Sequence, residues 1–288
     1  MTRTAVALAM VVVLGGLGSA RALDLEAAWT VPGLAEPAAV VYDAERDLLY
    51  VANVNGQATG DRAGFISKLG LDGTVLERTW VTGLEGPSGL TLHGGLLYAA
   101  DVDRLVAIDV EHGTVLESYP ASGAHTLGGI AVDAGGRVYI ADPATNVIFA
   151  FDHGSMQPWL SGAGLESPTA LLAEETGLVI ATWGVSSDAL TTDVPGHLKR
   201  VDYASKDVRT VGSSLPIGNL AGVQPWPNGG YLMTDGTQGS LLYADPSGGI
   251  ERLLELGAGA GALAVVPDAE LIVIPLRLDD QVVAYTWR

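Results

Sequence analysis

Four residues with oxygen-bearing side chains each end a short apolar segment of the chain: Asn53, Asp101, Asp142 and Asp235. If these segments are strands around one axis, the four side chains lie at the same end of it. There they could bind a hard cation or act as general acids and bases, which makes Asp101, Asp142 and Asp235 the candidate catalytic residues. The recurrence of the position favours a structural interpretation instead, in which each side chain bonds to backbone N–H groups of the following loop.

The segments that carry these residues belong to a repeat. Similar apolar runs occupy residues 48–53, 96–101, 137–142, 178–183, 230–235 and 271–276. Short strands with tight Gly-containing turns that recur about every 40–45 residues are typical of propeller blades. The sequence therefore predicts an all-β fold, a six-bladed β-propeller.

The last repeat, residues 262–288, has material for only three strands. A fourth is found at the other end of the chain, because residues 26–34 resemble residues 77–84 and place Trp29 where the first repeat has Trp80. We therefore expect the N-terminal strand to close the last blade, which removes an exposed sheet edge. The Trp residues are interpreted as packing anchors between blades.

Residues 1–22 have the pattern of a secretory signal peptide: a positive charge at Arg3, an apolar stretch, and small residues at Ala20 and Ala22. The remaining 23–288 are expected to form a single domain with no membrane span, exported to the periplasm or secreted. The formal net charge is −18 and no Lys/Arg cluster is present, which argues against nucleic-acid binding.

Two repeats are longer than the others, with extra residues at 53–64 and 183–196, between the second and third strands. In a propeller these loops surround one mouth of the central channel, where they are either functional or tolerated insertions. His125 is the one histidine expected near the channel, where a lone histidine is more often a structural residue than a base. Glu36 could also approach the mouth, but it is interpreted as a solvated loop charge. The candidate ligand-binding residues at the mouth are Asn53, Asn55, Thr169, Trp183 and Arg277.

The runs 50–56, 64–69 and 80–84 resemble the superfamily of gluconolactonase, regucalcin and luciferin-regenerating enzyme, in its exported bacterial branch. The resemblance implies a six-bladed propeller, a divalent metal in the channel and hydrolysis of lactones. The positions that match the metal ligands of that superfamily are Ala38, Gly128, Thr169 and Ala221. None of these is a strong ligand for a hard cation, so we expect neither a metal site nor another cofactor.

The sequence supports two functions. The favoured one is recognition of a small molecule or a protein at the channel mouth. The alternative is a lactone or ester hydrolase with a rearranged site around Asp101, Asp142 and Asp235. No Gly-x-Ser-x-Gly or His-Glu-x-x-His motif supports another hydrolase chemistry.

Overall fold

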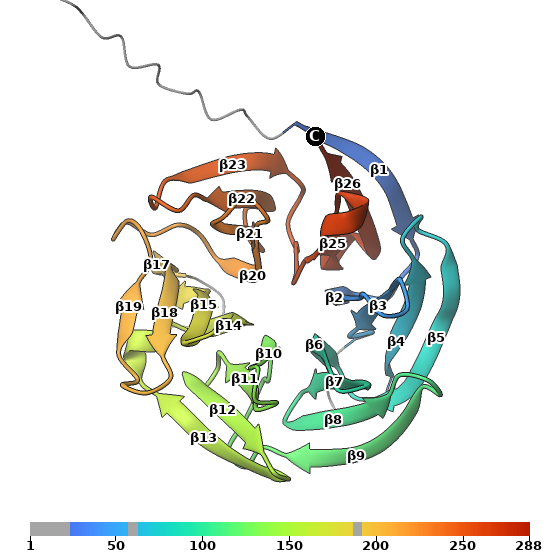
Figure 1. Cartoon of the computed structure of the whole chain (residues 1–288), viewed down its shortest axis with the longest axis horizontal. Coiled ribbons are helices and arrows are strands. Elements are labelled where there is room, and N and C mark those ends of the chain that lie inside the picture. Colours follow the sequence, from blue (N-terminus) through green and yellow to red (C-terminus); the bar gives the residue numbers. More distant parts are fainter. Residues whose placement is uncertain (1–23, 57–62, 187–191) are drawn as a thin grey trace, which may run out of the picture.

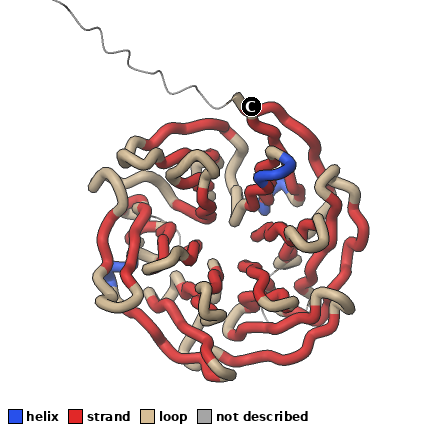
Figure 2. The backbone as a smooth tube through the Cα atoms, viewed as in Figure 1, coloured by secondary structure: helices blue, strands red, loops and turns tan. Residues whose placement is uncertain are grey.

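Six four-stranded antiparallel sheets surround a central axis in the computed structural model of the protein, which describes residues 24–56, 63–186 and 192–288 (Figure 1). Within each sheet the chain runs from an inner strand A through B and C to an outer strand D. The strands make up most of the ring, and the short helical turns lie in its connections (Figure 2). The predicted six-bladed propeller is confirmed.

The strand bounds follow the repeat along the chain. Blade 1 consists of β2 (Pro37–Asp43), β3 (Leu48–Asn53), β4 (Gly64–Gly70) and β5 (Val75–Leu84). Blade 2 consists of β6 (Pro87–His93), β7 (Leu96–Asp101), β8 (Arg104–Asp109) and β9 (Thr114–Pro120). Blade 3 consists of β10 (Ile130–Val132), β11 (Val138–Asp142), β12 (Val147–Asp152) and β13 (Ser155–Ser161).

The second half of the ring repeats the plan with one addition. Blade 4 consists of β14 (Pro168–Ala173), β15 (Gly177–Thr182), β18 (Leu198–Asp202) and β19 (Val208–Thr210), and its B–C loop carries the hairpin β16 (Gly184–Val185) and β17 (Val194–Pro195). Blade 5 consists of β20 (Leu220–Pro225), β21 (Tyr231–Asp235), β22 (Ser240–Ala244) and β23 (Ile250–Glu255). Blade 6 consists of β24 (Ala264–Val266), β25 (Leu271–Leu276), β26 (Gln281–Trp287) and β1 (Leu25–Pro32). Three-residue 3-10 turns are η1 (Ala163–Leu165), η2 (Pro267–Ala269) and η3 (Arg277–Asp279).

The hydrophobic core lies between neighbouring blades. Every residue of β15 and β25 is buried, whereas β9, an outer strand, is exposed along nearly its whole length. One cluster joins Leu49 and Val51 of blade 1 to Val266 and Leu271 of blade 6. Inner strands covered on both faces explain the nearly continuous apolar runs of the sequence.

The N-terminal strand closes the ring as predicted. Strand β1 pairs with β26 in antiparallel register, from Leu25 opposite Trp287 to Pro32 opposite Gln281. The indole Nε1 of Trp29 donates to the carbonyl of Leu71 in blade 1 at 2.8 Å. One chain therefore supplies its first and last strands to the same sheet.

Tryptophans of outer strands pack on glycines of the next blade. A Cβ atom added at Gly73 would lie 2.8 Å from the Trp29 ring, and one at Gly113 would lie 2.8 Å from the Trp80 ring. Both glycines also have positive φ angles, of 82° and 64°. These contacts confirm the predicted packing role of Trp29 and Trp80.

The strand order defines two faces of the ring. The mouth face carries the B–C loops and the starts of the A strands, and the opposite face carries the A–B and C–D turns. Among the helical segments that the structure describes, none is long and apolar enough to span a membrane. The predicted signal peptide lies outside the described residues.

Candidate functional site at the channel mouth

A cavity of about 460 Å³ opens on the mouth face. Loops of blades 1, 2, 3 and 6 supply its lining residues: Glu36, Val54, Gly56, Gly86, Ser88, Val102, His125, Thr126, Leu127 and Arg277. Pockets for small ligands usually measure about 300–1,000 Å³, so this cavity is large enough for a small molecule.

An ion pair forms one wall of the cavity. Arg277, at the start of η3 in blade 6, donates through Nε and Nη2 to Oε2 of Glu36 at 3.2 and 2.8 Å. Glu36 precedes β2 of blade 1, and its backbone N–H donates to Oδ1 of Asp280 at 2.9 Å. Within the described part of the chain, Nη1 of Arg277 and Oε1 of Glu36 have no hydrogen-bond partner, and the two side chains are 46% and 36% exposed.

A histidine lies on the blade 3 side of the cavity. The backbone N–H groups of His125 and Thr126 donate to the Asp142 carboxylate at 2.7 and 3.4 Å, which fixes the loop between β9 and β10. Neither ring nitrogen of His125 has a hydrogen-bond partner among the described residues. The imidazole is therefore available to a ligand.

The rest of the lining is largely apolar. Val54 and Leu127 are buried, and Val102 is half-buried in the two-residue turn between β7 and β8. The hydroxyl of Ser88 donates to the carbonyl of Leu127 at 2.5 Å, joining blades 2 and 3. The cavity thus has incompletely paired polar side chains from blades 1, 3 and 6 and apolar side chains from blades 1, 2 and 3.

The carboxylates that end strand B are engaged in structural hydrogen bonds. Asp101 accepts from the backbone N–H groups of Glu85 and Gly86 at 2.9 and 2.7 Å, and from Nε and Nη2 of Arg104 at 2.9 and 2.7 Å. Asp235 accepts from the N–H groups of Thr237 and Gln238, both at 2.9 Å.

Asp142 and Asn53 follow the same pattern. Besides its bonds to the His125 loop, Asp142 accepts from Ala144 N–H at 3.0 Å, while Asn53 accepts from Ala35 N–H at 3.2 Å and donates to Ser67 Oγ at 3.0 Å. Asp101, Asp142 and Asn53 are fully buried. The geometry agrees with the structural interpretation, and none of these residues lines the cavity.

The other sequence candidates are distributed around the mouth, and only Arg277 lines the cavity. Asn55 is exposed beside it and donates through Nδ2 to the carbonyl of Ala63 at 2.8 Å. The hydroxyl of Thr169 lies 2.5 Å from the carbonyl of Leu220 in blade 5, so it joins two blades. Trp183 is half-buried and packs against Gly236 of blade 5.

The residues at the superfamily's metal positions do not fit a divalent cation. Ala38 and Gly128 offer only backbone atoms, Ala221 is apolar, and the Thr169 hydroxyl is engaged with Leu220. No group of three or more His, Cys, Asp or Glu side chains is placed to hold a metal ion within residues 24–56, 63–186 and 192–288.

A second polar cluster supports the long B–C loop of blade 4. Glu166 contacts Nζ of Lys199 at 2.7 Å and Nδ1 of His197 at 2.7 Å, and Nε2 of His197 lies 3.3 Å from the carbonyl of Ser214. Burial alone would raise the pKa of Glu166, but the hydrogen bonds from Lys199 and His197 lower it. The cluster anchors the base of the β16–β17 hairpin.

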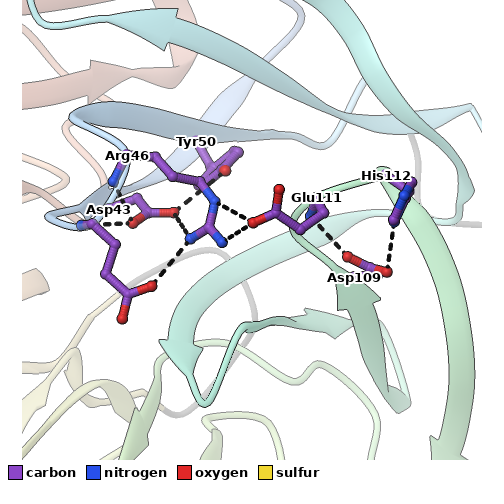
Figure 3. Close-up of polar contacts among 7 residues, drawn as sticks. Asp43, Arg46, Tyr50, Asp109, Glu111 and His112 are labelled. Carbon is purple, nitrogen blue, oxygen red and sulfur yellow. Dashed lines mark hydrogen bonds and ion pairs between the residues drawn. The ribbon is translucent and has the colours of Figure 1, made fainter.

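A third cluster lies on the opposite face and joins blades 1 and 2 (Figure 3). Arg46 bonds to Glu111 through Nε and Nη2 and to Asp43 through Nη1 at 3.1 Å. Tyr50 OH lies 3.4 Å from Asp43, and burial together with that carboxylate raises the pKa of Tyr50 to about 12. In the C–D turn of blade 2, Asp109 bonds to Nδ1 of His112 at 2.9 Å.

Sequence reasoning missed two features of the cavity. Glu36 was considered as a residue that could approach the mouth, but its ion pair with Arg277 in the lining of the cavity was not predicted. Val102 also lines the cavity, but as an apolar residue it was not among the sequence candidates. The proximity of Glu36 to Arg277, 241 residues apart, could have been inferred from the closure of blade 6 next to blade 1.

Comparison with known proteins identifies the fold alone. No protein-family model and no curated protein matches the chain. A solved gluconolactonase from Xanthomonas campestris matches with a TM-score of 0.71 at 13% identity, over 92% of this chain and 90% of that chain. Virginiamycin B lyase from Staphylococcus aureus matches with a TM-score of 0.62 at 12% identity, over 91% and 99%. A catalytically inactive variant of that lyase, solved with quinupristin, matches with a TM-score of 0.61 at 13% identity, over 92% and 99%. The chain therefore has the propeller fold that these enzymes share.

Proposed function

We propose that the protein binds an uncharged small molecule in the mouth cavity, through a polar group that contacts Arg277, Glu36 and His125. The observation that carries the proposal is the convergence of three incompletely paired polar side chains, from blades 6, 1 and 3, on one cavity of about 460 Å³. Clefts that combine apolar walls with a few convergent polar groups are the usual form of small-molecule sites.

The charges of the site favour an uncharged ligand. Glu36 already neutralises Arg277, and the formal net charge of −18 repels anions. A carbonyl oxygen can accept from Nη1 of Arg277, and an N–H or O–H group can donate to Oε1 of Glu36. A lactone, an ester or an amide has the required acceptor.

Hydrolysis of a lactone or ester is the second candidate, and the unpaired imidazole of His125 is the observation that favours it. A histidine with free ring nitrogens can act as a general base toward water. The buried carboxylates Asp101, Asp142 and Asp235 would then support the loops and take no part in proton transfer. In either case we propose that the exported protein acts without a divalent metal.

The test compares wild type with Arg277→Gln for binding of a panel of lactones, esters and amides, measured by ligand-detected NMR. We expect Arg277→Gln to weaken binding and Arg252→Gln, a control in the exposed pair with Glu255, to leave it unchanged. Equal binding by all three proteins would overturn the assignment of the mouth as the binding site. Turnover of a panel member that is lost in His125→Gln would establish the hydrolase.

A further inference from the structure

Val102 has a backbone conformation that valine rarely adopts. Its φ angle is +60°, in the left-handed region. It is the only β-branched residue among the described non-glycine residues with positive φ. The other ten are polar: Glu36, Asp47, Asn55, Asn146, His153, Glu166, Ser167, Lys206, Glu270 and Asp280.

This conformation is unfavourable for valine, because the Cβ of an L-residue approaches its own carbonyl oxygen there and a branched side chain has little room to adjust. Main-chain contacts hold the turn in place. The carbonyl of Val102 accepts from Leu127 N–H at 2.7 Å, and the carbonyl of Asp103 accepts from Ala121 N–H at 2.8 Å. Glycine or asparagine could make the same main-chain bonds without the strain.

The side chain that causes the strain lines the mouth cavity. Val102 of blade 2 lies between the other apolar lining residues, Val54 of blade 1 and Leu127 of blade 3, while the Glu36–Arg277 pair lies where blade 6 meets blade 1. Strained residues persist where the surrounding structure over-determines them, and they cluster at ligand-binding sites.

We propose that Val102 is a specificity-determining residue, and that the ligand is amphipathic, with a hydrocarbon group against Val102 and a polar head toward Arg277 and Glu36. The inference rests on the proposed function, since it assigns the chemistry of the ligand to the same cavity. It predicts that a hydrocarbon chain binds better than a polyhydroxylated chain of equal length.

The first test is stability. We expect Val102→Gly and Val102→Asn to raise the midpoint of thermal unfolding by about 2 °C, because the strain is relieved while the main-chain bonds remain. His153→Gly is the matched control, since His153 has a φ of 48° but is unbranched and lies on the opposite face; it should change the midpoint less. A fall in the midpoint of both Val102 variants would overturn the inference, because it would show that the side chain serves packing.

The second test is binding of two amides with six carbons each, hexanamide and gluconamide, followed by ligand-detected NMR. We expect wild type to bind hexanamide more tightly, Val102→Gly to weaken hexanamide binding about tenfold, and gluconamide binding to stay unchanged in that variant. Arg277→Gln should weaken binding of hexanamide as well.

The outcomes separate the two proposals. If Arg277→Gln weakens hexanamide binding and Val102→Gly does not, the specificity role of Val102 is wrong and the proposed function stands. If Arg277→Gln changes neither ligand, the proposed function fails. Wild type that binds gluconamide as tightly as hexanamide, or binds neither amide, overturns the amphipathic ligand.

Discussion

On the opposite face of the ring, Arg46 uses all three guanidinium nitrogens on carboxylates of blades 1 and 2, whereas Arg277 at the mouth leaves Nη1 without a partner among the described residues. Both arginines join neighbouring blades, and both lie beside a cavity, of about 350 Å³ at Arg46 and about 460 Å³ at Arg277. A fully paired network makes a structure rigid, while unpaired polar groups in a cavity are free to bind a ligand. This difference supports our proposal that the mouth is the functional face.

The buried carboxylates at the mouth refine this comparison. Asp101 and Asp142 are as fully paired as Arg46, yet they lie directly behind the cavity and fix the loops that carry Gly86 and His125. The mouth therefore has two layers. The inner layer, Asp101 and Asp142, has its hydrogen bonds made within the protein, and it positions an outer layer of cavity-lining side chains that have unpaired polar atoms. Pre-organised side chains on a rigid support bind at lower entropic cost.

Removal of the strand that closes the ring should have the largest effect on stability, and it should disturb both faces of the ring. A chain that begins at Glu36 lacks β1, including Trp29 and its contact with Leu71. We expect a loss of at least about 5 kcal/mol in the free energy of unfolding, because a whole outer strand and the half-buried Trp29 side chain are removed. Urea unfolding measures it, and a chain that begins at residue 23 is the control. An unchanged midpoint would contradict the closure of blade 6 by β1.

The next prediction compares the two layers of the mouth. Asp101→Ala should cost about 3–5 kcal/mol, because it leaves Arg104 and two N–H groups without their acceptor in a buried site. Arg277→Gln should cost less than about 1 kcal/mol, since its ion pair is exposed. Chemical unfolding of both variants measures the two losses, and Asp101→Asn is the isosteric control. Equal losses would remove the distinction between a structural inner layer and a functional outer layer.

The sequence predicted the ring in detail because each blade is a local repeat. The strands and their turns follow from the spacing of the repeat, and the missing outer strand of blade 6 follows from the likeness of residues 26–34 to residues 77–84, as the pairing of β1 with β26 confirms. The cavity was harder to predict because its lining comes from four blades, and contacts such as Glu36 with Arg277 depend on how the loops meet in space. Val102 could not be found from its residue type, because its significance is its φ angle.

A smaller effect is expected from pH, at the cluster that supports the β16–β17 hairpin. The folded-state pKa of Glu166 is lowered from 4.5, so its ion pairs stabilise the fold above that pH, and the contribution is lost as the pH falls through the lowered pKa. Glu166→Gln should therefore reduce stability at neutral pH and flatten its dependence on acid below pH 4.5. Thermal unfolding midpoints of the variant and of wild type, measured across that pH range, test the direction of this dependence. A variant with the same acid profile as wild type would show that Glu166 has no such role.

The smallest effect should come from divalent cations, and it tests whether the mouth has a hidden metal centre. The positions of the superfamily's ligands hold Ala38, Gly128, Thr169 and Ala221, and hard cations need charged oxygens from several sides. A site for Ca²⁺, Mg²⁺, Mn²⁺ or Zn²⁺ at 100 times its dissociation constant would stabilise the fold by about 2.7 kcal/mol, which a thermal scan detects. We expect no saturable shift with any of the four ions. A saturable shift abolished by Asp101→Asn or Asp142→Asn would place a cation among carboxylates that here bond only to the protein, and the inner layer of the mouth would then be functional as well.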